Sequence, residues 1–469
     1  MHKLTSALIL LLVPILINAQ SIPTEIAGKW MGKINVGVEL RLVFNYKISG
    51  DTIYTTIDSP DQGVKGIPTE KTTFLDNEIT ITIPIIGGSF TGKFIRDSVL
   101  INGIWKQSGG NLPIKLLKVD SVETAKRPQN PIKPYPYKEE EVVFKNKSAE
   151  SVFLAGTLTI PQGSGPFKAV ILVSGSGPQN RDEFILGHSP FLILSDRLTR
   201  QGIIVLRYDD RGVAKSTGDF NAATTMDFAS DADAAVKYLK SRKDLIISEI
   251  GIAGHSEGGL IAPITATKNK NVDFIVMLAG PGIPGDSILN LQGDLIAKAS
   301  GFTDSMIYYY SAIRHAIINV VKEETDMQVI SQKIITINKE FLKTTPPYIL
   351  DQMQMSAKDS TSALDFYANV WTKYFLSYDP RPTLEKLKIP VLALNGTSDL
   401  QVPFKENLNG IEMALKKSGS GNYKIMEMKG LNHLFQVSES GSPGEYSILE
   451  ETFNEEVMEI IANWILNLH

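Results

Sequence analysis

The sequence predicts two folded parts: an α/β domain with a mostly parallel sheet, helices on both faces and a helical cap insertion, and before it a small all-β domain, either a barrel or a sandwich. Three observations lead to this fold class. Residues 22–119 alternate polar and apolar side chains with a period of two. Four prolines then fall within 123–137. From residue 138 onward, continuous apolar runs alternate with helical patterns, which is typical of strands buried on both faces.

The first 20 residues predict a secretory signal peptide. Lys3 precedes an apolar run, and Ala19 offers a small residue before a cleavage site. The run from Leu8 to Ile17 is too short for a comfortable membrane span, and Pro14 interrupts it. We therefore expect a periplasmic or secreted protein with no integral membrane span after the leader is removed.

Composition excludes several classes of function. The formal net charge of -4 provides no basic field, so we expect no nucleic-acid partner. The chain has no cysteine, which excludes disulfides, thiolate metal sites and a cysteine nucleophile. No His-Glu-x-x-His pattern occurs, and we expect neither a metal nor a cofactor.

Residues 21–122 form the predicted β domain, with strand patterns such as "VELRLVFNYKI" and "EITITIPI". Its opening, "IAGKWMGKI", resembles the Gly-x-Trp strand of lipocalin-like barrels, which implies an interior that holds a ligand. The favoured alternative is that Trp30 and Trp105 are ordinary core residues of an accessory domain.

Residues 123–137 are the predicted linker, because proline-rich, charged stretches favour extended backbone. The α/β domain then occupies 138–469. Within it, residues 281–387 show helical patterns without strand runs. This insertion follows the carboxyl end of a strand, on the edge where open α/β sheets bind ligands, so we expect it to act as a cap.

The stretch "GIAGHSEGGL", residues 251–260, predicts a nucleophile elbow. An apolar strand pattern precedes Ser256 and a helical pattern follows it. Gly254 and Gly258 stand two residues to either side, where small residues let the strand and the helix approach closely. The alternative, a glycine turn with a bystander serine, is weaker because of this context.

A serine nucleophile needs a base and a group that orients the base. Of the six histidines, His433 in "GLNHLF" lies in a loop after the last predicted strand, which favours it as the base. Asp399 in "NGTSDLQVP" follows the preceding strand and is the expected orienting carboxylate. For Asp399 alone, turn chemistry is the alternative.

The tetrahedral intermediate needs backbone amide donors. We expect these from Glu257, directly after the nucleophile, and from Ser176 in the loop "SGSGPQNRDE". Arg181 and Asp182, further along this loop, either line the mouth of the site or form an ion pair.

Together, "SGSGPQNRD", "YDDRGVAKS", "GHSEGG", "NGTSDLQVP" and "GLNHLF" make residues 138–469 resemble α/β-hydrolase-fold serine esterases, in particular bacterial carboxylesterases of the dienelactone-hydrolase and serine-aminopeptidase-like branch. The resemblance implies the triad Ser256, Asp399 and His433, in the chain order of that fold. Where many relatives have His-Gly before the oxyanion residue, this chain has Ser174-Gly175. The resemblance does not extend to the β domain.

The leading hypothesis is therefore an exported serine carboxylesterase that hydrolyses a small-molecule carboxylic ester through an acyl-enzyme on Ser256. A serine peptidase or amidase with the same triad is the alternative. A third hypothesis is a binding protein without catalytic activity, in which the β domain carries the function. An intact set of Ser256, Asp399 and His433 argues against it.

Overall fold

In a computed structural model, the chain is described over residues 22–35, 39–107, 110–122, 126–353, 355 and 364–468. The predicted signal peptide, residues 1–20, lies outside the described residues. The chain divides into two compact units, Met1–Thr124 and Ala125–His469, and each is described by itself.

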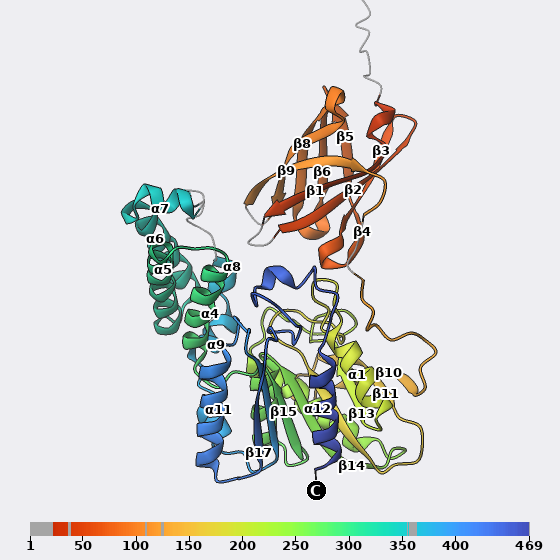
Figure 1. Ribbon diagram of the computed structural model, residues 1–469, viewed down its shortest axis with the longest axis vertical. Coiled ribbons are helices and arrows are strands. Elements are labelled where there is room, and N and C mark those ends of the chain that lie inside the picture. The colour runs from red at the N-terminus through yellow and green to blue at the C-terminus, as the bar shows by residue number, and fades with distance from the viewer. Residues whose placement is uncertain are drawn as a thin grey trace, which may run out of the picture. The chain divides into compact units, whose positions relative to one another are not determined.

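The first unit is a closed antiparallel barrel (Figure 1). Its described residues form β1 (Gly28–Asn35), β2 (Glu39–Ser49), β3 (Thr52–Ser59), β4 (Val64–Pro68), β5 (Lys71–Leu75), β6 (Glu78–Ile83), β7 (Gly88–Ile95), β8 (Leu100–Gln107) and β9 (Gly110–Val119). The strand order is β2-β1-β9-β8-β7-β6-β5-β3-β4, and β2 also pairs with β3. This additional pairing closes the ring and leaves β4 beside β3. Of the two predicted forms, the unit is therefore a barrel.

Large aromatic side chains fill the inside of this barrel. Trp30 and Trp105 are 0% and 1% exposed. The Phe44 ring centroid lies 4.7 Å from that of Phe90 and 6.1 Å from that of Trp105. The indole N–H of Trp30 donates to the carbonyl oxygen of Ile26 at 2.7 Å, so its polar atom is satisfied inside the core. Both tryptophans pack the core, as in the favoured interpretation of the sequence.

The second unit is built on an eight-stranded, mostly parallel sheet. Its strands are β10 (Lys138–Lys145), β11 (Phe153–Ile160), β12 (Phe167–Val173), β13 (Ile204–Tyr208), β14 (Ile247–His255), β15 (Phe274–Leu278), β16 (Val391–Gly396) and β17 (Tyr423–Met428). They follow the order β10-β11-β13-β12-β14-β15-β16-β17, in which only β10–β11 and β11–β13 are antiparallel. The predicted α/β class is confirmed. The connections run in opposite directions from β12, which makes the carboxyl ends of β12 and β14 the expected place for a site.

Helices cover both faces of this sheet (Figure 1). One face packs against α1 (Pro190–Arg200) and α12 (Glu455–Leu466), and the other against α2 (Thr225–Ser241), α3 (Gly258–Lys268) and α11 (Phe404–Ser418). Along β12, Val170 and Leu172 join the first core, whereas Ile171 and Val173 join the second. Because both cores are apolar, the strands read as continuous apolar runs.

Between β15 and β16 the chain forms an additional helical layer, within the range predicted as a cap. Its helices are α4 (Gly285–Ala299), α5 (Asp304–Glu323), α6 (Met327–Thr344), α7 (Pro347–Gln352), α8 (Leu364–Tyr367), α9 (Val370–Ser377) and α10 (Arg381–Leu384). The layer has an apolar core of its own around Ile317 and Ile330, and Ile288 and Phe375 join it to the core of the sheet. Among the described helices, none is both long enough and apolar enough to cross a membrane.

Most of the predicted linker is fastened to the second unit. The Arg127 guanidinium donates to the carbonyl oxygens of Gly187 at 3.0 Å and Leu449 at 2.6 Å. The Gln129 side-chain amide donates to the carbonyl oxygen of Phe453 at 2.7 Å. These partners are carbonyl oxygens in loops of the second unit. From Arg127 onward the segment belongs to the α/β unit.

The aromatic packing predicts the effect of truncating a barrel tryptophan. Trp105→Ala leaves a cavity beside Phe44, and we expect the free energy of unfolding of the barrel to fall by about 3–5 kcal/mol. Urea unfolding of the full chain, followed by circular dichroism, measures this loss. The control is Tyr54→Ala on the outside of the barrel, where the side chain is 59% exposed and we expect a change within about 0.5 kcal/mol. Equal losses in the two variants would contradict a filled interior.

Candidate active site

Ser256 stands at a sharp turn between β14 and α3. Its backbone φ is 52°, in the left-handed region that residues with side chains rarely adopt. Its N–H donates to the carbonyl oxygen of Leu278 at 2.8 Å. A Cβ built on Gly254 would lie 1.9 Å from the Gly258 carbonyl oxygen, and one built on Gly258 would lie 2.1 Å from the Val173 carbonyl oxygen. Only glycine fits at these two positions, and strand, turn and helix follow one another as a nucleophile elbow requires.

Asp399 and His433 form a buried hydrogen bond. Asp399 follows β16 and His433 follows β17, so parallel pairing places both at the same edge of the sheet. The His433 Nδ1 atom lies 2.8 Å from Asp399 Oδ2, and the side chains are 5% and 0% exposed. Asp399 Oδ1 accepts the backbone N–H groups of Gln401 at 2.8 Å and Val402 at 2.9 Å. With the proton on Nδ1, the other ring nitrogen of His433 presents a lone pair that can accept a proton.

His255 links the His433 loop to the turn at Ser256. The ring centroids of His255 and His433 are 4.8 Å apart, and His255 Nε2 lies 2.9 Å from the His433 backbone carbonyl oxygen. His255 directly precedes Ser256 in the chain. The structure therefore brings Ser256, Asp399 and His433 together at one edge of the sheet.

The loop after β12 lies beside Ser256, and several of its polar groups already have hydrogen-bond partners. The Ser174 hydroxyl donates to Asp210 Oδ1 at 2.9 Å, and the Gly175 N–H donates to Glu183 Oε1 at 2.7 Å. Within the described part of the chain, the backbone amides of Ser176 and Glu257 donate no hydrogen bond. These are the two amides expected from the sequence to receive an oxyanion.

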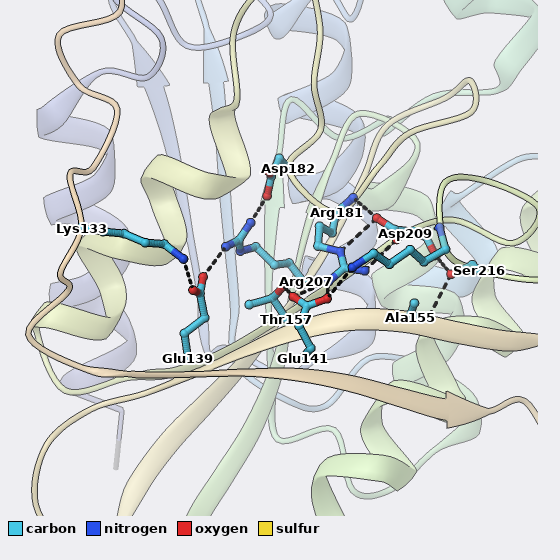
Figure 2. A network of polar contacts seen from close by, with 11 residues as sticks. Lys133, Glu139, Glu141, Ala155, Thr157, Arg181, Asp182, Arg207, Asp209 and Ser216 are labelled. Atoms are coloured by element: carbon cyan, nitrogen blue, oxygen red, sulfur yellow. Dashed lines mark hydrogen bonds and ion pairs between the residues drawn. The ribbon is translucent and has the colours of Figure 1, made fainter.

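Ion pairs hold the far end of this loop (Figure 2). Arg181 Nη2 lies 2.8 Å from Asp209 Oδ2, and its Nη1 lies 2.9 Å from Glu141 Oε1. Asp182 pairs with Arg207, whose side chain is 4% exposed. Of the two roles left open for Arg181 and Asp182, both residues therefore take that of an ion pair, and each has a buried partner. These pairs attach the loop to β10 and to the residues around the end of β13.

The carboxylate of Glu257 connects the turn to the cap. Its Oε1 accepts the Thr225 hydroxyl at 2.6 Å and the Trp371 indole N–H at 2.7 Å. Trp371 lies in the first turn of α9, and its ring stacks on that of Phe375 with centroids 5.2 Å apart. Burial raises the pKa of Glu257 to about 6, although both hydrogen bonds act to lower it. The residue expected to supply an oxyanion amide is thus also bonded to the cap.

Sequence reasoning missed the polar partners Glu183, His255, Trp371 and the Glu257 carboxylate. Glu183 and His255 are 72 residues apart, and Glu257 and Trp371 are 114 residues apart. No local spacing brings such residues together. The available signal was the glutamate in "GHSEGGLIAP", a single charge among glycines and apolar residues that burial obliges to find partners.

Two other histidines of the described chain lie away from this cluster. His188 is buried, with Nδ1 2.8 Å from the Thr452 hydroxyl and Nε2 2.6 Å from the Tyr446 carbonyl oxygen. Burial lowers the pKa of His188 to about 4. His315 lies on the exposed side of α5. Across the described residues, no group of three or more histidine, aspartate or glutamate side chains is arranged to hold a metal ion.

The Arg181–Asp209 pair predicts a pH-dependent loss of stability. Asp209→Asn removes the buried counter-ion of Arg181 and leaves only the exposed Glu141, so we expect the free energy of unfolding of the α/β unit to fall by about 1.5–3 kcal/mol near neutral pH. Burial acts to raise the pKa of Asp209, but hydrogen bonds from Arg181 lower it overall. The wild type therefore keeps this contribution above the ordinary aspartate range, about pH 4, and loses it as the pH falls through the lowered value.

Urea unfolding at about pH 7 and about pH 3 tests this expectation. The difference in the free energy of unfolding between the wild type and Asp209→Asn should be smaller at the lower pH. Glu412→Gln is the control, since it breaks an exposed pair with Lys416 that contributes about 0.5 kcal/mol or less. An equal difference in the free energy of unfolding at both pH values would contradict the view that the Arg181–Asp209 pair depends on the charge of Asp209.

The Trp371 contact predicts a second pH-dependent effect. Trp371→Phe keeps an aromatic ring against Phe375 but removes the donor to Glu257, at an expected cost of about 1.5–3 kcal/mol when the carboxylate is ionised. Burial raises the pKa of Glu257 to about 6 in the folded state. The unfolded chain therefore loses this proton first, and the free energy of unfolding falls as the pH rises from the ordinary glutamate range toward about 6. Losing the donor raises this pKa further, so the variant should melt lower mainly above about pH 7.

Melting temperatures of the wild type and Trp371→Phe at about pH 5 and about pH 8 measure this difference. Trp464→Phe is the matched control, because the Trp464 ring packs edge-on to Phe274 at 6.0 Å. Among the hydrogen bonds of the described residues, none involves its indole N–H. The prediction fails if both variants shift equally at both pH values.

Comparison with known proteins identifies the family. A family model described as serine aminopeptidase, S33, matches residues 190–334. Esterase EstD from Thermotoga maritima is 31% identical over 328 residues, which cover 69% of this chain and 68% of the relative. Similar solved structures include an esterase from Pyrococcus furiosus (15% identity, 70% of this chain and 92% of the other, TM-score 0.41) and a proline iminopeptidase from Mycobacterium smegmatis (15% identity, 70% and 98%, TM-score 0.43). Since the EstD match spans two thirds of both chains, this protein belongs to the α/β-hydrolase esterase family that includes Esterase EstD.

Proposed function

We propose that the protein is a serine carboxylesterase that hydrolyses a small-molecule carboxylic ester through an acyl-enzyme on Ser256. The observation that carries this proposal is the buried bond of 2.8 Å between His433 Nδ1 and Asp399 Oδ2, located beside a strained turn that presents a serine. The similarity to Esterase EstD supports an ester as the substrate.

In the proposed reaction, Ser256 Oγ attacks the ester carbonyl carbon while His433 Nε2 accepts the hydroxyl proton. Asp399 stabilises the resulting imidazolium through its bond to Nδ1. The amides of Ser176 and Glu257 receive the negative charge of the tetrahedral intermediate, and each such donor typically contributes about 3 kcal/mol. His433 then gives its proton to the departing alcohol, which leaves the acyl group on Ser256.

Hydrolysis of the acyl-enzyme reverses these roles. Water attacks the acyl carbon, His433 accepts a proton from the water, and the second tetrahedral intermediate uses the same amides. Collapse of this intermediate breaks the acyl bond to Ser256 and returns the proton to its oxygen. The products are a carboxylic acid and free enzyme.

A serine peptidase or amidase is the second candidate. The family model matching residues 190–334 carries a serine aminopeptidase description, and the same three residues serve both reactions. An amide has a poorer leaving group than an ester, so the two candidates differ in the substrate that is turned over.

We further propose that the protein is exported to the periplasm or to the exterior. The support is the leader pattern of residues 1–20, with Lys3 before an apolar run and Ala19 near its end. N-terminal sequencing of protein recovered from cell fractions would locate the cleavage. Protein retained in the cytoplasm with its leader intact would refute this proposal.

Hydrolysis of p-nitrophenyl esters, from acetate to palmitate, tests the proposed activity beside aminoacyl anilides. We expect the wild type to turn over esters, with a maximum at one acyl length that reports the size of the acyl pocket. Ser256→Ala should lower kcat by roughly 10⁴- to 10⁶-fold, because the nucleophile is lost while the amide donors remain.

Ser241→Ala, on the exposed end of α2, is the matched serine control and should keep wild-type kcat. Anilide turnover with negligible ester cleavage would favour the peptidase. Ester turnover that survives in Ser256→Ala would refute the acyl-enzyme on this residue.

A further inference from the structure

His255, the residue before the proposed nucleophile, is bonded through both ring nitrogens. We infer that His255 is a buried imidazolium paired with Glu183, and that this ion pair positions both the loop of the proposed oxyanion amide and the loop of the proposed base. The functional part of this inference rests on the proposed function. The protonation of His255 is independent of the proposed function.

The two contacts of His255 are both with oxygen atoms that accept hydrogen bonds. Nδ1 lies 2.8 Å from Glu183 Oε1, and Nε2 lies 2.9 Å from the backbone carbonyl oxygen of His433. A carbonyl oxygen can only accept, so Nε2 must carry a proton. Glu183 Oε1 also accepts the Gly175 N–H at 2.7 Å, which suits an ionised carboxylate oxygen with two donors. Both contacts are satisfied when Nδ1 is protonated as well, and the ring is then an imidazolium.

His188 provides a contrast within the same unit. It is also buried, but its Nδ1 faces the Thr452 hydroxyl, which can donate, while its Nε2 faces the Tyr446 carbonyl oxygen. One proton on Nε2 satisfies both contacts. His188 therefore needs no charge to satisfy its contacts, whereas His255 beside an ionised Glu183 does.

The charged groups around His255 support this assignment. The side chains of Glu183 and His255 are 4% and 6% exposed, so solvent does not screen the pair. Burial acts to lower the pKa of His255, but the Glu183 charge and hydrogen bond, the His433 carbonyl and the Asp399 charge raise it overall. The imidazolium is thus fully present below the ordinary histidine range, about pH 6.5, and is lost only as the pH rises through the elevated value.

Glu183 is held in an unusual backbone conformation to make these contacts. Its φ is 51°, and its N–H donates to the Asn180 carbonyl oxygen at 2.8 Å. Positive φ at a residue with a side chain costs of order 1–3 kcal/mol and persists where surrounding structure enforces it. Here the turn aims the carboxylate at Gly175 and His255 together.

The pair joins the two loops on which the proposed chemistry depends. Glu183 holds the amide of Gly175, so the amide of the next residue, Ser176, is left for the oxyanion. A Cβ on Gly175 would lie 3.1 Å from the Ser256 Cβ, so this loop passes directly over the nucleophile. At the other end, His255 holds the carbonyl of His433. Glu183 and His255 are positioning residues in this arrangement, because they act through the residues they hold.

Nuclear magnetic resonance of the full chain labelled with ¹⁵N-histidine tests the protonation directly. Proton–nitrogen correlation spectra from about pH 5 to about pH 9 report the state of each ring nitrogen, and His255→Gln assigns the signals. We expect both nitrogens of His255 to be protonated at neutral pH, with His188 showing one protonated nitrogen as an internal control. An unprotonated nitrogen on His255 at neutral pH would overturn the inference.

Glu183→Gln tests the positioning role, because it keeps the shape and an acceptor for Gly175 but removes the charge. We expect His255 to become neutral in the spectra, and kcat for the best p-nitrophenyl ester to fall roughly tenfold to a hundredfold, below the loss of a whole oxyanion donor. KM should stay within about twofold, since substrate contacts are unchanged. Activity should be lost first on the alkaline side of the pH profile.

Glu412→Gln, the same substitution on the surface of α11, should leave kcat and the spectra unchanged. If Glu183→Gln retains wild-type kcat and pH profile, the positioning role is overturned. If Glu183→Gln does not fold, the wild-type spectra still decide the protonation of His255. An unprotonated ring nitrogen on His255 in those spectra would contradict the inference. Wild-type protein that shows the imidazolium but hydrolyses no ester would refute the proposed function and leave the ion pair established.

Discussion

The left-handed backbone of Ser256 is the constraint on which the rest of the site depends. At a φ of 52° the strand before Ser256 and the helix after it come almost into contact, and Gly254 and Gly258 allow that approach. Gly258 also lies against the Val173 carbonyl, so the turn requires β12 as the neighbour of β14. The loop that leaves β12 then has to pass over the serine. One local conformation therefore dictates which loops can meet there.

Three buried carboxylates hold three different elements against this turn. Glu183 holds the β12 loop through Gly175, Glu257 holds the cap through Trp371, and Asp399 holds His433. Burying charge carries a large desolvation cost, so such groups are a poor source of net stability. Their value lies in geometry, since a charged acceptor with a fixed donor tolerates little displacement. The apolar cores stabilise the unit, and these polar contacts specify the arrangement at its edge.

The fold class could be predicted because each unit has its own periodicity. Period-two alternation indicated an all-β domain, either a barrel or a sandwich, and continuous apolar runs indicated a sheet buried on both faces. The proximity of Asp399 and His433 could also be predicted, because each follows a strand and the carboxyl ends of parallel strands lie at one edge of the sheet. The contacts of Glu183, His255 and Trp371 could not be predicted, since the paths of the loops and the position of the cap determine their partners. Strand order within the barrel, including the β2–β3 closure, likewise depends on long-range pairing that alternation cannot specify.

The hydrogen bonds of Arg127 bear on where the chain can be divided. Composition places a boundary across the whole proline-rich segment, which makes residue 138 a natural start for an isolated α/β unit. Such a fragment would lack the guanidinium that satisfies carbonyl oxygens in two loops, at Gly187 and at Leu449. Those loops are more than two hundred residues apart in sequence, and the hydrogen bonds of Arg127 connect them. The structural unit that contains the α/β sheet therefore includes Arg127, and the segment that looks like a spacer is part of that unit.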